Sequence, residues 1–118
     1  MNIQIFGTSK SFDTKKAQRW FSERGIRVQY IDLKEKEMSR GEFDNVKQAV
    51  GGYAALIDSA AKDKQTLALL ECLVEYQRED KLFENQQLLK TPIVRSGRKA
   101  AVGYAPEIWE AWLAADKK

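Results

Sequence analysis

The first 33 residues predict a strand, a helix and a second strand, and this order constrains the fold more than any other feature of the sequence. Residues 2–6 alternate polar and apolar side chains up to Gly7, and residues 26–33 alternate again. Between them, residues 14–24 place apolar side chains at helical spacing, and Gly25 ends the pattern. A helix between two strands this close in sequence favours a right-handed crossover that joins parallel strands.

The remaining sequence predicts a helical segment followed by a hairpin and a last helix. The expected elements are helices over about 40–50, 63–76 and 79–89, two short strands over 91–102, and a helix that begins at Pro106. The order β-α-β, helices, β-β-α predicts an α/β fold with a mixed sheet flanked by helices. A chain of 118 residues has the length of one domain, so we expect a single domain over 1–118.

The composition excludes several kinds of catalytic and metal site. Histidine is absent, so the chain holds no Ser-His-Asp triad, no histidine general base and no His-ligated zinc. Cys72 is the only cysteine, and one cysteine forms neither an internal disulfide nor a thiolate metal site. Because Cys72 stands among leucines in a predicted helix, we expect a small buried hydrophobic residue rather than a nucleophile.

The sequence contains no signal for export or membrane insertion. It does not begin with a basic region followed by a long apolar run, and no stretch approaches the ~18 apolar residues of a membrane helix. We therefore expect a cytoplasmic protein that does not associate with a membrane.

The surplus of positive charge lies at the start of the chain, where the first strand leads into the first helix. The net charge is +3, and Lys10, Lys15 and Lys16 cluster in this region. Free backbone amides at a helix N-terminus favour negative charge, so the loop is physically suited to an anion or a thiolate. The alternative is that Ser11 or Asp13 merely caps the helix and that the lysines are solvated. The local pattern leaves both interpretations open.

Three stretches in a fixed order resemble the arsenate-reductase-like family, which includes ArsC, Spx and YffB types and glutaredoxin-like relatives. They are FGTSKSFDTKKAQRW at 6–20, LLKTPIV at 88–94 and VGYAPEIWEAWL at 102–113. The resemblance implies a thioredoxin-like, or glutaredoxin-like, mixed four-stranded sheet flanked by helices. It also implies an inserted helical segment at about 39–89, between the βαβ and ββα halves.

The resemblance assigns positions to the family's functional residues. Ser11 occupies the position of the nucleophilic cysteine, Thr14 that of a second cysteine, and Lys15 that of the basic residue that follows. Lys10, Thr91 and Pro92 are the implied anion-binding or positioning residues. Pro92 is expected to be cis and to face the nucleophile loop, and Thr91, after Lys90, replaces the arginine that helps to hold the oxyanion in arsenate reductases.

Serine at position 11 changes the expected chemistry. A serine hydroxyl forms no disulfide and needs an adjacent general base to act as a nucleophile. The chain is therefore expected to be a thiol-redox protein by lineage and inactive as written. Either the lineage has lost the chemistry, or an original cysteine was replaced by serine. With cysteine at position 11, the resemblance implies arsenate-reductase-like or monothiol glutaredoxin-like activity.

The resemblance also indicates partners. No cofactor or metal is expected to be bound. Glutathione or a dithiol protein such as glutaredoxin or thioredoxin is the expected reductant. The alternative is a non-catalytic, Spx-like regulatory or protein-binding domain that contacts RNA polymerase. Direct binding to nucleic acid is not expected.

Overall fold

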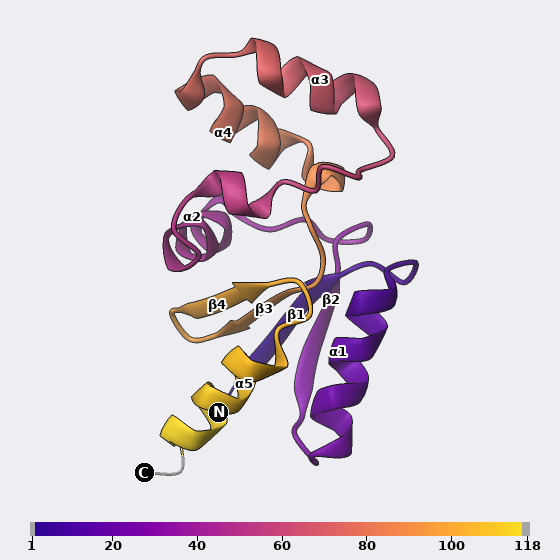
Figure 1. Cartoon of the computed structure of the whole chain (residues 1–118), viewed down its shortest axis with the longest axis vertical. Coiled ribbons are helices and arrows are strands. Elements are labelled where there is room, and N and C mark those ends of the chain that lie inside the picture. Colours follow the sequence, from indigo (N-terminus) through magenta and orange to yellow (C-terminus); the bar gives the residue numbers. More distant parts are fainter. Residues whose placement is uncertain (1, 117–118) are drawn as a thin grey trace.

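A mixed four-stranded sheet forms the centre of the protein (Figure 1). The computed structural model describes residues 2–116. The strands are β1 (Ile3–Gly7), β2 (Val28–Asp32), β3 (Ile93–Ser96) and β4 (Lys99–Val102), in the spatial order β2-β1-β3-β4. β1 pairs with β2 in parallel, and β3 pairs antiparallel with both β1 and β4. The prediction of a thioredoxin-like α/β fold with a mixed four-stranded sheet is confirmed.

Five α-helices and two short 3₁₀ helices accompany the sheet. The α-helices are α1 (Phe12–Glu23), α2 (Arg40–Ala49), α3 (Lys64–Cys72), α4 (Glu75–Glu84) and α5 (Pro106–Asp116). The 3₁₀ helices are η1 (Tyr53–Leu56) and η2 (Gln86–Leu88). All elements from α2 to η2 lie between β2 and β3 in the chain. No helix within residues 2–116 combines the length and the apolar character that a membrane span requires.

The two faces of the sheet carry separate apolar cores. Ile5 lies on one face of the sheet and Phe6 on the other, because successive side chains of a β-strand point to opposite faces. α1 and α5 cover the first face with buried Trp20, Phe21, Trp109 and Trp112. α2, η1 and the helices that follow cover the second face with buried Phe43, Val46, Leu56, Leu82 and Leu88. β1 therefore lies between two packed layers, with Ile3 and Ile5 in one core and Phe6 in the other.

α3 and α4 form an arm at the end of the molecule opposite α5 (Figure 1). The prediction of one helix over 63–76 is wrong, because α3 ends at Cys72 and Leu73 has an extended backbone. No glycine or proline marks this break. Instead, the Arg78 guanidinium donates to the carbonyl oxygens of Leu73 (2.7 Å) and Glu71 (2.9 Å). A side chain from the next helix thus satisfies carbonyls that a continuing helix would have bonded.

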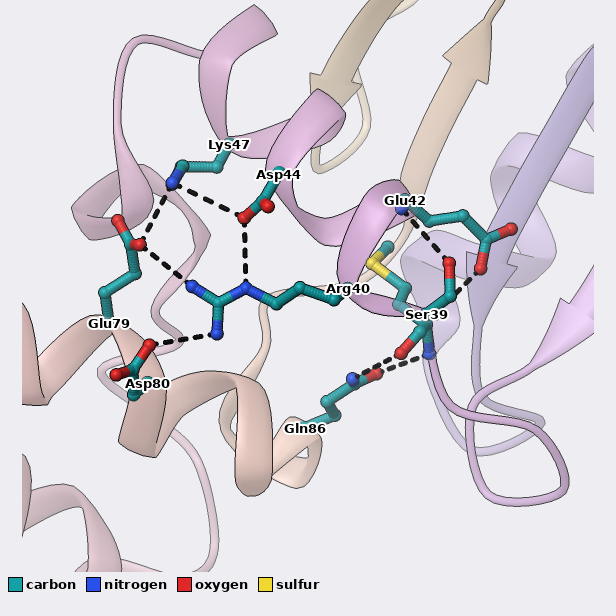
Figure 2. Close-up of polar contacts among 9 residues, drawn as sticks. Ser39, Arg40, Glu42, Asp44, Lys47, Glu79, Asp80 and Gln86 are labelled. Atoms are coloured by element: carbon teal, nitrogen blue, oxygen red, sulfur yellow. Dashed lines mark hydrogen bonds and ion pairs between the residues drawn. The ribbon is translucent and has the colours of Figure 1, made fainter.

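Charged side chains connect α2 to the arm (Figure 2). On α2, the Arg40 guanidinium contacts Asp44 at 3.2 Å, and across to α4 it contacts Glu79 at 3.2 Å and Asp80 at 2.9 Å. The Lys47 ammonium contacts Glu79 at 3.0 Å and Asp44 at 3.5 Å. We call these five residues the α2–α4 clasp.

Cys72 is exposed, which corrects the expectation that it is buried. Among the residues of α3, only Leu70 is buried, because the helix packs on one side only and nothing in the described chain covers its outer face. The neighbouring Leu69 is exposed as well. The sequence shows an apolar helix at this point, but the fold supplies no second layer for it.

Candidate functional site

Ser11 is the N-cap of α1, at the end of the loop that leaves β1. Its backbone is extended, and its hydroxyl oxygen accepts a hydrogen bond from the Thr14 backbone amide at 3.2 Å. Its carbonyl accepts from the Lys15 amide at 3.2 Å, and its own amide donates to the Thr8 carbonyl at 3.1 Å. Of the two residues proposed as the cap, Ser11 has this role. Asp13 instead lies in the first turn of the helix.

The first turn of α1 also presents free backbone donors. The amides of Phe12 and Asp13 donate to no group within residues 2–116, as expected for the first amides of a helix. The positive end of the helix dipole lies at the same place. A group seated beside Ser11 therefore meets unpaired amides, an arrangement that stabilises negative charge.

Thr14 connects α1 to the end of β1. It is fully buried, and its hydroxyl oxygen has no hydrogen-bond partner in the described part of the chain. Gly7 packs against it so closely that an added Cβ would stand 2.5 Å from both Cγ2 and Oγ1 of Thr14. The position that the resemblance gives to a second cysteine thus holds a packed side chain that fixes the helix start on the sheet.

Pro92 lies beside the same loop. The Thr91–Pro92 peptide bond is cis, and Pro92 is buried. The β1–β3 register ends with the pair Phe6 and Ile93, so Pro92 directly precedes the last paired residue of β3 and Gly7 directly follows that of β1, where the chain enters the loop to Ser11. Its carbonyl accepts a hydrogen bond from the Gly103 amide at 2.7 Å. The topology therefore brings Pro92 to the β1–α1 loop, as the resemblance implied.

Lysines supply the positive charge near this loop. Lys10 and Lys15 are exposed, and the Lys15 ammonium lies 5.9 Å from the centre of the Phe12 ring. Beside Pro92, Thr91 is half-buried and Lys90 is exposed, while the Lys90 amide donates to the Leu56 carbonyl at 2.8 Å. The site thus combines helix amides with exposed lysine charges. Thr91 provides a single hydroxyl at the position where an arginine would provide several donors in a fixed planar arrangement.

Phe12 is a residue of this site that the sequence reasoning missed. It is the first residue of α1, directly after the cap, and 81% of its side chain is exposed. A large apolar residue at this exposure is unusual in a chain whose other phenylalanines contribute to cores. The available signal was its position outside the buried stripe formed by Ala17, Trp20 and Phe21.

An open cavity of about 970 Å³ lies away from this site, between α2, η1 and the start of α4. Its walls include Lys47 and Glu79, which already pair with each other in the α2–α4 clasp. Asp44, Tyr53 and Tyr76 also line it. None of the sequence-predicted site residues lines it, so the cavity does not change the choice of candidate site.

Comparison with known proteins identifies the family of the chain and relatives of the same fold. The sequence profile of the ArsC family matches residues 6–112. An ArsC family related protein from Bacteroides fragilis is 22% identical, with a TM-score of 0.81, over 94% of this chain and 97% of that chain. An arsenate reductase from Vibrio cholerae is 22% identical, with a TM-score of 0.77, over 92% of this chain and 94% of that chain.

A third structure, an arsenate reductase related protein from Brucella melitensis, is 21% identical, with a TM-score of 0.68, over 96% of this chain and 95% of that chain. Identities at this level establish the fold. No curated protein sequence matches the chain. Because the profile match spans most of the sequence, from the end of β1 into α5, the chain belongs to the ArsC family.

Proposed function

We propose that this ArsC-family chain binds an anion at the start of α1 and performs no thiol redox chemistry there. The observation that carries the proposal is Ser11, whose oxygen accepts the Thr14 amide hydrogen bond at the position of the family's nucleophile. In thiol exchange, a thiolate attacks a disulfide sulfur, forms a new S–S bond and releases the other thiolate. A serine oxygen forms no such bond.

Serine also lacks the means of activation that hydrolytic enzymes use. Its hydroxyl needs a neighbouring base to remove the proton, and the sequence contains no histidine. Lys10, directly before Ser11, is a cation that stabilises an anion rather than accepts a proton. The nearest carboxylate, that of Asp13 in the first turn of α1, forms no hydrogen bond with the Ser11 hydroxyl in the described part of the chain. The free amides of Phe12 and Asp13 support the same conclusion, because they are donors placed at a helix terminus.

The test of this proposal uses a pair of proteins that differ only at position 11. Cys72 is exposed and would react with any thiol reagent, so both proteins carry Cys72→Ser. In the Ser11→Cys/Cys72→Ser protein, the helix terminus and the lysines should lower the thiol pKa below the free value of about 8.5. Thiolate absorbance against pH measures it. The same protein should form a mixed disulfide with glutathione disulfide, and the Cys72→Ser protein should not.

Two outcomes would contradict the proposal. Arsenate reduction by the Cys72→Ser protein with glutathione, glutaredoxin or thioredoxin as reductant would show that Ser11 does not abolish turnover. A pKa at or above about 8.5 for the introduced thiol would show that the loop does not favour negative charge. Glutathione, glutaredoxin or thioredoxin would act as a reductant only for a protein with cysteine at position 11.

Anion binding by the unmodified chain is tested directly with inorganic phosphate. In an NMR titration, phosphate should shift the backbone amides of residues 11–15, because these residues form the first turn of α1 and its cap. Lys15→Gln should weaken the effect. Lys99→Gln, a charge change at an exposed position on β4, should leave it unchanged. Unmoved amides at 11–15 would remove the anion site.

A further inference from the structure

An aromatic and cationic surface adjoins the start of α1. Phe12 is 81% exposed, and the Lys15 ammonium lies over its ring at 5.9 Å. Lys16 follows one helical turn after Phe12, so the two side chains are neighbours on the helix. The Lys16 ammonium lies 4.5 Å from the centre of the Tyr104 ring. We call Phe12, Lys15, Lys16 and Tyr104 the Phe12 face.

The Phe12 face is held by the core beneath it. Tyr104 packs edge-on against the buried Trp109 ring, with 5.4 Å between ring centres. Trp109 in turn packs against Trp20 of α1 at 5.3 Å. Both sides of the face, the first turn of α1 and the turn before α5, are therefore fixed to one apolar core. A surface that is already ordered loses little conformational entropy when a partner binds.

The positive charge of this face is not neutralised by the protein. Lys15 and Lys16 form no ion pair within residues 2–116, and the same holds for the nearby Lys10. In contrast, Arg40 and Lys47 of α2 are paired with carboxylates in the α2–α4 clasp. The exposed Phe12 is therefore flanked by three lysines without an ion pair, and Asp13 is the one acidic residue between Lys10 and Lys16 in the sequence.

We propose that the Phe12 face is the docking surface for an acidic polypeptide that carries an apolar side chain. The lysines complement carboxylates, and Phe12 with Tyr104 supplies the aromatic contact that typically anchors a protein interface. A two-fold contact of this face with the same face of a second copy does not fit, since it would bring the same lysines together. The charge covers one helix start rather than the extended stripe that nucleic acids require.

This inference goes beyond the proposed function, because it does not depend on the anion site. The side chains of Phe12, Lys16 and Tyr104 belong to the surface alone, whereas the anion site uses the backbone amides of the first turn; Lys15 is common to both, so it is not used to test the docking surface. A protein that fails to bind phosphate can still bind the acidic polypeptide, and the reverse also holds. The two proposals are therefore tested separately.

The test measures binding of synthetic peptides to the natural chain by NMR and fluorescence anisotropy. The first peptide has glutamates on both sides of a central leucine and phenylalanine. The second keeps the centre but replaces the glutamates by lysines, and the third keeps the glutamates but has serines at the centre. We expect the first peptide to bind most tightly, to shift the amides of residues 12–16 and 104, and to dissociate as salt is raised.

Two variants and two matched controls localise the effect. Phe12→Ala should weaken binding of the first peptide roughly tenfold, as expected for an aromatic anchor. Lys16→Gln should weaken it about threefold, as expected for an exposed charge pair. Tyr76→Ala and Lys99→Gln remove an exposed aromatic and an exposed lysine elsewhere and should leave binding unchanged. Both Phe12 and Lys16 are exposed, so their replacement preserves the fold.

Three results would overturn the proposal. Equal binding of the lysine peptide would show that charge does not select the partner. Amide shifts confined to other elements, or equal losses in the Tyr76→Ala control, would place the contact elsewhere. Tighter binding to phosphatidylserine vesicles or to duplex DNA than to the acidic peptide would assign the surface to a different class of partner.

Discussion

The side chain of Gln86 forms two hydrogen bonds with the backbone of Met38, 48 positions earlier in the chain. The Met38 amide donates to Gln86 Oε1 at 2.7 Å, and Gln86 Nε2 donates to the Met38 carbonyl at 3.0 Å. Both residues are buried. The Gln86 side chain thus pairs with the Met38 backbone as a neighbouring strand would. It joins η2, which follows α4, to the segment before α2 (Figure 2).

Replacement of Gln86 by leucine should therefore destabilise the protein. The change leaves a buried amide and a buried carbonyl of Met38 without partners, and each unpaired group costs about 1–3 kcal/mol. We expect the free energy of unfolding to fall by about 2–4 kcal/mol, measured by urea denaturation with circular dichroism. Gln65→Leu, at an exposed position on α3, is the control and should change it by less than about 0.5 kcal/mol. Equal effects of the two variants would contradict the structural role of Gln86.

The close contact between Gly7 and Thr14 predicts a second stability effect. A Cβ at position 7 would stand 2.5 Å from two Thr14 atoms, so Gly7→Ala should cost about 1–3 kcal/mol through overpacking. Gly41 on α2 has no atom within 4 Å of an added Cβ. Gly41→Ala should therefore stabilise the protein by about 0.4–1 kcal/mol, since alanine restricts the unfolded chain.

The Gly7 effect should depend on Thr14. In a double-mutant cycle, Thr14→Ala removes the two atoms that clash and should recover part of the Gly7→Ala loss, giving a coupling above about 0.5 kcal/mol. If the losses of stability from Gly7→Ala and Thr14→Ala are additive in thermal or urea unfolding, the methyl group at position 7 does not clash with Thr14.

The central sheet could be predicted from sequence because local signals agree with the tertiary structure. Alternation in β1 and the apolar spacing in α1 match the two faces that they bury, and Gly25 has the positive φ that ends a helix. Ser39 likewise begins α2 with a capping box to Glu42. Here each residue's intrinsic preference and its packing point to the same structure.

The arm could not be predicted to the same degree because its form depends on contacts between distant residues. The end of α3 relies on Arg78 reaching back from α4, and no residue type at 72–74 encodes that stop. The exposure of Cys72 follows from the absence of a covering layer in the described fold, which periodicity does not report. The candidate site shows the same division. Ser11 and Pro92 were predicted from the resemblance, whereas the sequence reasoning passed over Phe12, whose position outside the apolar stripe of α1 was the only sign of its exposure.

The α2–α4 clasp should respond to salt. The Glu79 carboxylate forms ion pairs with both Arg40 and Lys47, and its side chain is only 25% exposed. Glu79→Gln should lower the free energy of unfolding by about 1 kcal/mol at low ionic strength and by less in molar salt, where the charges are screened. Glu84→Gln on the same helix is the matched control, because Glu84 forms no ion pair among residues 2–116. A loss that is the same in both variants, or that is insensitive to salt, would show that the clasp does not hold the arm.

Asp63 at the start of α3 predicts a dependence of stability on acid. Its carboxylate accepts from the Thr66 hydroxyl at 2.7 Å, the Thr66 amide at 3.1 Å and the Gln87 amide group at 3.1 Å. These hydrogen bonds, that of the Thr66 hydroxyl first, lower the pKa of Asp63 below its ordinary value of 3.8. A lowered pKa in the folded state gives stability that is complete above the ordinary value and is lost as pH falls through the folded value.

The measurement compares unfolding at neutral and acidic pH in the natural protein and in Asp63→Asn, since asparagine can still cap the helix but carries no charge. The natural protein should lose more stability than the variant as pH falls through the carboxyl range. Thr66→Val removes the strongest donor and should raise the pKa of Asp63, which NMR titration of the side-chain carboxyl would report. If both variants keep the pH profile of the natural protein, the Asp63 hydrogen bonds do not contribute to its acid sensitivity.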